Sequence, residues 1–131
     1  SAVFEHLYAP WLMPGQISKV LKLGGMTFHE THFSFGSHER PWHFFQFSDM
    51  GLKCLFNSDF GFQVVDSGMS NPMVGRFTTR SSRYLWNRIV DEMYCHSSIL
   101  AKKVSESKFS SWDAIDTGKL VSNTFYPLPK N

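Results

Sequence analysis

The stretch PGQISKVLKLGGMTFHETHFSF, residues 14–35, decides the fold, because its pattern is that of a short helix, a glycine turn and a strand. Pro14 suits a first helical turn, and Gly24 is placed to end the helix in a left-handed turn. The segment Met26–Phe33 is rich in Phe and Thr and too short for a helix with its caps, so it predicts a strand that runs into a loop. The apolar helix positions recur at the i, i+3, i+4 spacing of an amphipathic helix: Ile17, Val20 and Leu21.

A second helix and strand follow. In SDMGLKCLFN, residues 48–57, Ser48 is placed as N-cap and Asp49 in the first turn. The next segment, GFQVVDSG at residues 61–68, predicts a strand closed by Ser67 and Gly68. The apolar face of the helix consists of Leu52, Leu55 and Phe56.

The rest of the chain is less regular. Asn71 and Pro72 indicate a loop, and RSSRYLWNRIVDEM, residues 80–93, has only a weak helical stripe, so residues 69–91 are mostly left without a prediction. MYCHSSILAKKVS, residues 93–105, predicts a last strand. From Glu106 the pattern predicts an irregular tail held by aromatic residues around Trp112 and in TFYPLP, residues 124–129.

Composition limits the class of protein. With 131 residues, 42% hydrophobic and 18% charged, the chain predicts one globular unit. A net charge of +2 without a basic run gives no indication of a nucleic-acid surface, and no apolar run reaches the roughly 20 residues of a membrane span. Cys54 and Cys95 have neither metal-pair spacing nor the density of a disulfide scaffold, so we expect free thiols and a cytoplasmic location.

Four of the six histidines lie between Gly24 and Phe47, which raises the question of a metal site. Side chains alternate along a strand, so His29 and His32 should point to opposite faces unless the strand ends between them. The HExxH pattern is absent, and the spacing therefore disfavours a metal. Two interpretations stay open: the histidines are hydrogen-bonded loop residues without a function, or the loop after a parallel strand lines a ligand cleft. The histidines and carboxylate considered as ligands are His29, His32, His38, Glu39 and His43.

Two stretches carry a resemblance to a family. SAVFEHLYAPWLMPGQISKVLKLGG, residues 1–25, resembles the second half of class I S-adenosylmethionine-dependent methyltransferases of the type 11 kind, where the fourth strand ends in a motif similar to residues 3–7. THFSFGSHERPWHFFQFSDMGLKCLF, residues 31–56, is similar to the loop and helix that follow the fifth strand in a subgroup of that family. His43 and Gln46 depart from the subgroup, which often has an acid and an arginine there.

The resemblance implies an α/β fold: the second half of a Rossmann-like methyltransferase sheet, strands 4 to 7 with crossover helices and an antiparallel last strand. It implies two regions, residues 1–105 as the C-terminal half of the domain and residues 106–131 as the tail. The family's glycine-rich turn and ribose-binding acid, which hold the cofactor, have no counterpart in this sequence. We therefore expect an N-terminal half of the same domain outside this chain.

The implied cofactor is S-adenosylmethionine, and the implied partner is a small-molecule or glycan-type acceptor. Three histidines are the candidate catalytic residues, because a neutral imidazole can take a proton from an acceptor near neutral pH: His6, His32 and His38. The positions expected near the methionine part of the cofactor are Ser1, Ala2, Val3 and Phe4. Candidate acceptor contacts are His29, Trp42, Phe44 and Phe45, with ordinary core or lid packing as the alternative for the aromatic residues.

Two other classes of protein remain. One is a methyltransferase-like binding or scaffold module without catalysis. The other is a metal-dependent hydrolase that uses the histidines, which predicts metal in the purified protein. For the methyltransferase, we expect His6, His32 and at least one of His38 and Trp42 to converge on one pocket at the carboxyl edge of the sheet.

Overall fold

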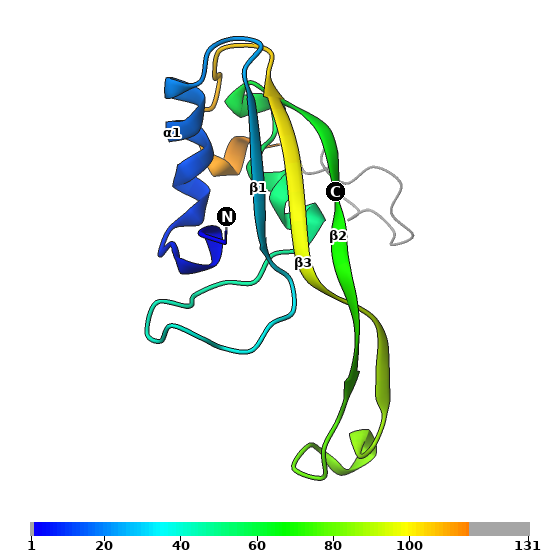
Figure 1. Cartoon of the computed structure of the whole chain (residues 1–131). Helices are drawn as coiled ribbons and strands as arrows, with labels where there is room; N and C mark the ends of the chain where they lie inside the picture. The colour runs from blue at the N-terminus through cyan, green and yellow to red at the C-terminus, as the bar shows by residue number, and fades with distance from the viewer. Residues whose placement is uncertain (1, 116–131) are drawn as a thin grey trace, which may run out of the picture.

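Three strands form one sheet in the order β1-β3-β2 (Figure 1). The structure is a computed structural model, and it describes residues 2–115. The strands are β1 (Met26–His32), β2 (Phe62–Arg76) and β3 (Ile89–Lys103). β3 lies between the other two and is antiparallel to both, so β1 and β2 run parallel to each other. The last strand is antiparallel, as the resemblance implies, whereas the larger Rossmann-like sheet stays a prediction.

Two helices form where the sequence predicted them. In α2 (Asp49–Leu55) the Ser48 side chain accepts a hydrogen bond from the Gly51 N–H, as expected of an N-cap. α1 (Met13–Val20) has Pro14 in its first turn, but Val20 is 84% exposed. The predicted stripe was therefore wrong at Val20, and the residues that pack against the core lie four apart: Met13, Ile17 and Leu21.

Two local predictions need correction. Gly24 has the predicted left-handed conformation, with φ of 80°, but it lies in the turn before β1 and donates its N–H to the Lys103 carbonyl rather than capping α1. Residues around Phe4–His6, where the resemblance implied the end of a strand, form a single 3-10 turn.

The hairpin formed by β2 and β3 is longer than predicted. Both strands have 15 residues, and the part beyond β1 extends from the sheet as a two-stranded ribbon (Figure 1). The interpretation of Asn71 and Pro72 as a loop was wrong, because β2 continues through them. β2 is an edge strand, and a proline on an edge strand can face away from the neighbouring strand without loss of a hydrogen bond between strands. The register of β2 with β3 shifts after Val64 and again after Met73.

The core lies between one face of the sheet and the helices. Alternate β3 residues from Ser97 to Lys103 are buried, whereas the opposite face exposes Phe28 by 57%. The predicted role of aromatic residues at the start of the tail is confirmed by the stacking of Phe109 on Phe60, with ring centroids 4.2 Å apart. TFYPLP lies outside the described residues. The core residues are Phe4, Leu52, Leu55, Phe56, Phe60, Phe62, Ile99 and Ala101.

Among residues 2–115, no helix has the length and apolar character needed to cross a lipid bilayer.

Candidate functional site

Glu5 is a fully buried carboxylate at the carboxyl end of β1. The turn Phe4–His6 carries it, and its backbone carbonyl accepts hydrogen bonds from the N–H groups of Phe44 and Phe45 at 2.8 and 3.2 Å. The Thr31 hydroxyl donates to Glu5 Oε2 at 2.6 Å. The last residues of β1 and the returning loop thus fix both the backbone and one carboxylate oxygen of Glu5.

His32, the last residue of β1, faces the second carboxylate oxygen. Its Nδ1 lies 3.0 Å from Glu5 Oε1. The contact does not have hydrogen-bond geometry, and neither atom has another hydrogen-bond partner among the described residues. Burial lowers the pKa of His32, while Glu5 acts in the opposite direction and His96 and His38 lower it further. The net direction favours a neutral imidazole.

His6 and His38 approach Glu5 from two different segments. His6 Nε2 lies 3.9 Å from Glu5 Oε1 and 3.4 Å from Glu39 Oε2. The His6 and His38 rings have centroids 5.1 Å apart, and His38 is 5.0 Å from His32. The three histidines therefore lie close together at the end of β1, whereas the expected pocket there and their catalytic roles stay predictions.

Two further histidines complete the group. His43 packs against His38 with ring centroids 4.5 Å apart, and its Nδ1 accepts from the His38 backbone N–H. His96 is paired with His32 across β1 and β3, with ring centroids 5.1 Å apart. We call these residues the histidine cluster: Glu5, His6, His32, His38, His43 and His96.

The loop from Phe33 to Phe47 is held at both ends, which explains how residues far apart in sequence meet. Its far end returns to β1 through the Phe47 N–H, which donates to the His32 carbonyl at 2.9 Å. The Ser97 hydroxyl of β3 donates to the Phe47 carbonyl at 2.6 Å. Because both ends of the loop lie at the end of the sheet, His38 and His43 within the loop lie close to His6.

Sequence analysis missed three members of this site. It gave no site role to Glu5, Thr31 or His96. His96 could have been found from the expected antiparallel pairing of the last strand, because that pairing places His96 opposite His32. Nothing local in the sequence indicates the long-range bond between Glu5 and Thr31.

His29 is separate from the cluster, which corrects its grouping with the acceptor contacts. Its ring stacks on Phe56 and meets the edge of Phe4, with centroids 4.8 and 4.9 Å away. Thr27 Oγ1 lies 2.7 Å from its Nε2. Burial lowers the pKa of His29 to about 4, so it is a neutral core histidine at physiological pH.

The three aromatic residues assigned to acceptor contacts form the outer side of the loop. Trp42 is 64% exposed, and Phe44 packs edge-on against Tyr8. Phe45 packs edge-on against Trp11. The Trp42 carbonyl, rather than its indole, contacts the cluster, because it lies 2.8 Å from His6 Nδ1.

The four positions assigned to the cofactor divide into two kinds. Ala2 and Val3 are exposed, so their side chains are accessible to a ligand. Phe4 is a core residue, so a cofactor could meet only its backbone. Ser1 lies outside the described residues.

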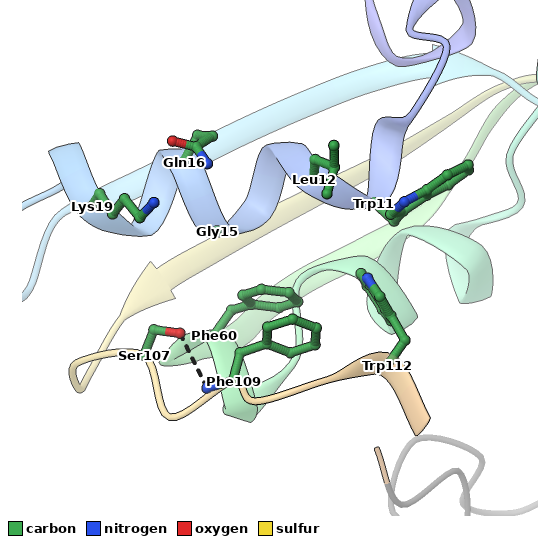
Figure 2. A pocket seen from close by; sticks show the side chains of 9 residues that line it. All are labelled: Trp11, Leu12, Gly15, Gln16, Lys19, Phe60, Ser107, Phe109 and Trp112. Atoms are coloured by element: carbon green, nitrogen blue, oxygen red, sulfur yellow. Dashed lines mark hydrogen bonds between the residues drawn. The ribbon is translucent and has the colours of Figure 1, made fainter. Parts of the chain in front are cut away.

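A separate cavity of about 280 Å³ lies between α1 and residues 107–112 (Figure 2). Its floor is the stack of Phe60 on Phe109, and Trp11 and Trp112 border it. Figure 2 shows Lys19 and Gln16 on the α1 side. The sequence analysis did not single out this cavity.

Comparison with protein-family models, curated proteins and solved structures gives no match for this chain. The resemblance to methyltransferases therefore depends on the residues quoted above.

Proposed function

We propose that this chain supplies the acceptor side of an S-adenosylmethionine-dependent methyltransferase, with His32 as the residue that receives the acceptor proton. The observation that carries this proposal is the pairing of His32 with the buried Glu5 at the end of β1. In the class I fold that the resemblance implies, ligands bind at the carboxyl ends of the strands, and this pair lies at the carboxyl end of β1.

Glu5 is suited to orient the imidazole and to stabilise its charged form. Thr31 holds Oε2, which leaves Oε1 facing His32 Nδ1. A carboxylate beside one ring nitrogen favours a proton on that nitrogen and leaves Nε2 as the acceptor. We expect His32 to alternate between its neutral and charged forms beside Glu5.

Methyl transfer needs a positioned nucleophile more than it needs a strong base. S-adenosylmethionine would supply an electrophilic methyl group when bound. The chain's own residues would hold an acceptor hydroxyl or amine near His32 Nε2, which receives its proton as the nucleophile bonds to the methyl carbon. His32 would later release that proton to water outside the site.

The strand arrangement supports the same proposal. The family's last strand reverses direction, and here β3 is antiparallel to β1 and β2 and lies between them. Residues 2–4 could face only part of a cofactor, since Phe4 is in the core. We therefore assign the larger share of cofactor binding to the half of the domain that the resemblance implies.

The outer aromatic residues fit an acceptor with a ring or sugar face. Trp42 and Phe44 pack edge to face beside the cluster and expose 64% and 39% of their surface. Aromatic faces bind sugars and small rings through apolar contact, without a need for charge. The acceptor class in this proposal is a small molecule or glycan.

A cytoplasmic location is part of the proposal. Cys54 and Cys95 are both free thiols, which is typical of a reducing compartment. Burial raises the pKa of Cys54, so this thiol stays protonated and unreactive.

The test uses the protein encoded by the complete reading frame that contains this chain. It is incubated with S-adenosylmethionine labelled in the methyl group and with fractionated small-molecule and glycan extracts of the source organism. We expect label in one fraction and a loss of about 10²–10⁴-fold in turnover for His32→Gln, the range for general base catalysis.

The matched control is His29→Gln, which removes a histidine of the same strand that lies outside the cluster. It should keep turnover within a few-fold of the parent at a temperature where both are folded. Absence of labelled product in every fraction, or equal turnover of His32→Gln and the parent, would refute the proposal.

A further inference from the structure

We infer that Glu5, His6 and His38 form a binding site for a divalent first-row transition metal, with Zn²⁺ as the best match. One ligand atom from each residue lies within 4.8 Å of the other two. This set differs from the one disfavoured on sequence spacing, because Glu5 and His6 come from the N-terminal turn and His38 from the loop after β1.

The two imidazoles already have the hydrogen bonds that metal-bound histidines use. His6 Nδ1 lies 2.8 Å from the Trp42 carbonyl, and His38 Nδ1 lies 2.9 Å from the Gly36 carbonyl. A carbonyl can only accept, so each Nδ1 is the protonated nitrogen and each Nε2 keeps a free lone pair. Ligating histidines usually donate their second N–H to a backbone carbonyl or a carboxylate, which fixes the ring for the metal.

Glu5 provides the second, independent observation. Its side chain is fully buried, and Oε1 has no hydrogen-bond donor among the described residues, while Oε2 is held by Thr31. A buried carboxylate oxygen without a donor is costly, and a cation removes that cost. His43 Nε2 is a second buried polar atom without a partner in the same cluster.

The ligand chemistry selects the metal. Two imidazoles and one carboxylate are a ligand set of catalytic zinc sites, in which the fourth position is open. Tetrahedral bonds of about 2.1 Å bring ligand atoms to about 3.4 Å from each other, so the three groups must close slightly around the ion. Glu39, 71% exposed and 3.4 Å from His6 Nε2, is available as a fourth ligand.

This inference does not require methyl transfer, because metal binding is measured on the chain itself. If the proposed function also holds, the ion would lie beside His32 and could polarise an acceptor hydroxyl. A chain that binds Zn²⁺ without methyl transfer, or transfers methyl without Zn²⁺, would separate the two proposals.

The experiment uses the tag-free 131-residue chain, freed of metal with a chelator and titrated with ZnCl₂ in a calorimeter. We expect one Zn²⁺ per chain, and Co²⁺ as a probe should give the visible absorption of a four- or five-coordinate site. His38→Ala and Glu5→Gln should each weaken Zn²⁺ binding by at least about tenfold, the lower end of losses seen even for outer-shell groups. His29→Gln, which removes a histidine of β1 that lies outside the cluster, should bind Zn²⁺ like the parent.

A thermal melt keeps the test decisive if one variant is unstable. At 100 times the dissociation constant, Zn²⁺ should raise the melting temperature of the parent and of His29→Gln, because it binds the folded state, and leave that of His38→Ala unchanged. The inference is overturned if the parent binds no Zn²⁺, or if His38→Ala and Glu5→Gln bind it as tightly as the parent.

Discussion

Glu5 determines how the end of β1 is built, because a buried carboxylate must find donors or a cation nearby. Its backbone carbonyl holds the loop, Oε2 takes the Thr31 hydroxyl and Oε1 faces His32. The approach of His38 to His32 could be predicted, because a strand end and the loop after it lie together. The position of His6 was expected from a strand end, but residues 4–6 form a 3-10 turn. The role of Glu5 could not be predicted, since its partner Thr31 is 26 residues away.

Thr31→Val tests how much this arrangement depends on one hydroxyl. Valine has the same shape, so the change removes the donor to Glu5 Oε2 and leaves a buried carboxylate with one partner fewer. We expect a loss of about 1–3 kcal/mol in the free energy of unfolding, measured in urea. Thr78→Val, at an exposed position, should change it by less than about 0.5 kcal/mol. Equal losses for the two variants would contradict this account.

His29 predicts a pH dependence of stability that is separate from the histidine cluster. Burial lowers its pKa from 6.5 to about 4 in the folded chain, so the unfolded state binds more protons between these values. The contribution of His29 is therefore complete above pH 6.5 and is lost as the pH falls towards 4. We expect the melting temperature to fall over this window, and the fall to be smaller in His29→Phe, which keeps the stacking on Phe56. The same slope in both proteins would exclude His29 as the cause.

At the scale of elements, local signals predicted α2 and its cap because Ser48 needs only the Gly51 N–H, three residues away. The prediction for β2 was too short, because Asn71 and Pro72 are typical turn residues when the local sequence is considered alone. Only the partner strand shows that β2 is an edge, where Pro72 pairs with Tyr94 and Asn71 adopts φ of 56°. Whether a proline ends a strand thus depends on pairing, which the local sequence does not contain.

Two glycines with the same backbone conformation should respond differently to alanine. Gly24 and Gly61 have φ of 80° and 83°, so both substitutions force a side chain into the left-handed region. A Cβ at Gly24 meets no atom within 4 Å, whereas one at Gly61 clashes with the Ser105 carbonyl oxygen. We expect a cost of about 1–2 kcal/mol for Gly24→Ala, the backbone cost alone, and a clearly larger loss for Gly61→Ala by urea unfolding. A similar loss for both would mean that the contact with Ser105 relaxes freely.

At the scale of the whole molecule, the core and the ribbon are separate. The buried apolar residues lie in residues 4–101, but none of them falls within residues 73–93, which form the outer ribbon. The ribbon exposes Val74, Tyr84 and Ile89 by 67% or more. We therefore expect removal of the ribbon to change the free energy of unfolding only slightly.

A shortened hairpin tests this separation. Pro72 and Tyr94 are paired across β2 and β3, so replacing residues 73–93 with Asn-Gly leaves a two-residue turn of the favoured type. We expect a folded chain with a melting temperature close to that of the parent, by circular dichroism. Ile99→Ala, a fully buried core position, should lose about 2–5 kcal/mol in the same assay. A shortened chain that is less stable than Ile99→Ala would show that the ribbon supports the core.

The 131-residue chain should bind S-adenosylmethionine with a dissociation constant weaker than about 1 mM, or about −4 kcal/mol. The resemblance implies that the adenine and ribose contacts come from outside this chain, and Phe4 can offer a cofactor only its backbone. Each buried polar contact that is absent costs roughly 1 kcal/mol or more, so several of them remove several orders of magnitude in affinity. Calorimetry on the zinc-free chain measures this, with the protein encoded by the complete reading frame that contains this chain measured beside it. Micromolar binding by the chain alone would mean that it contains a complete cofactor site. The assignment of most cofactor contacts to the other half of the domain would then be wrong.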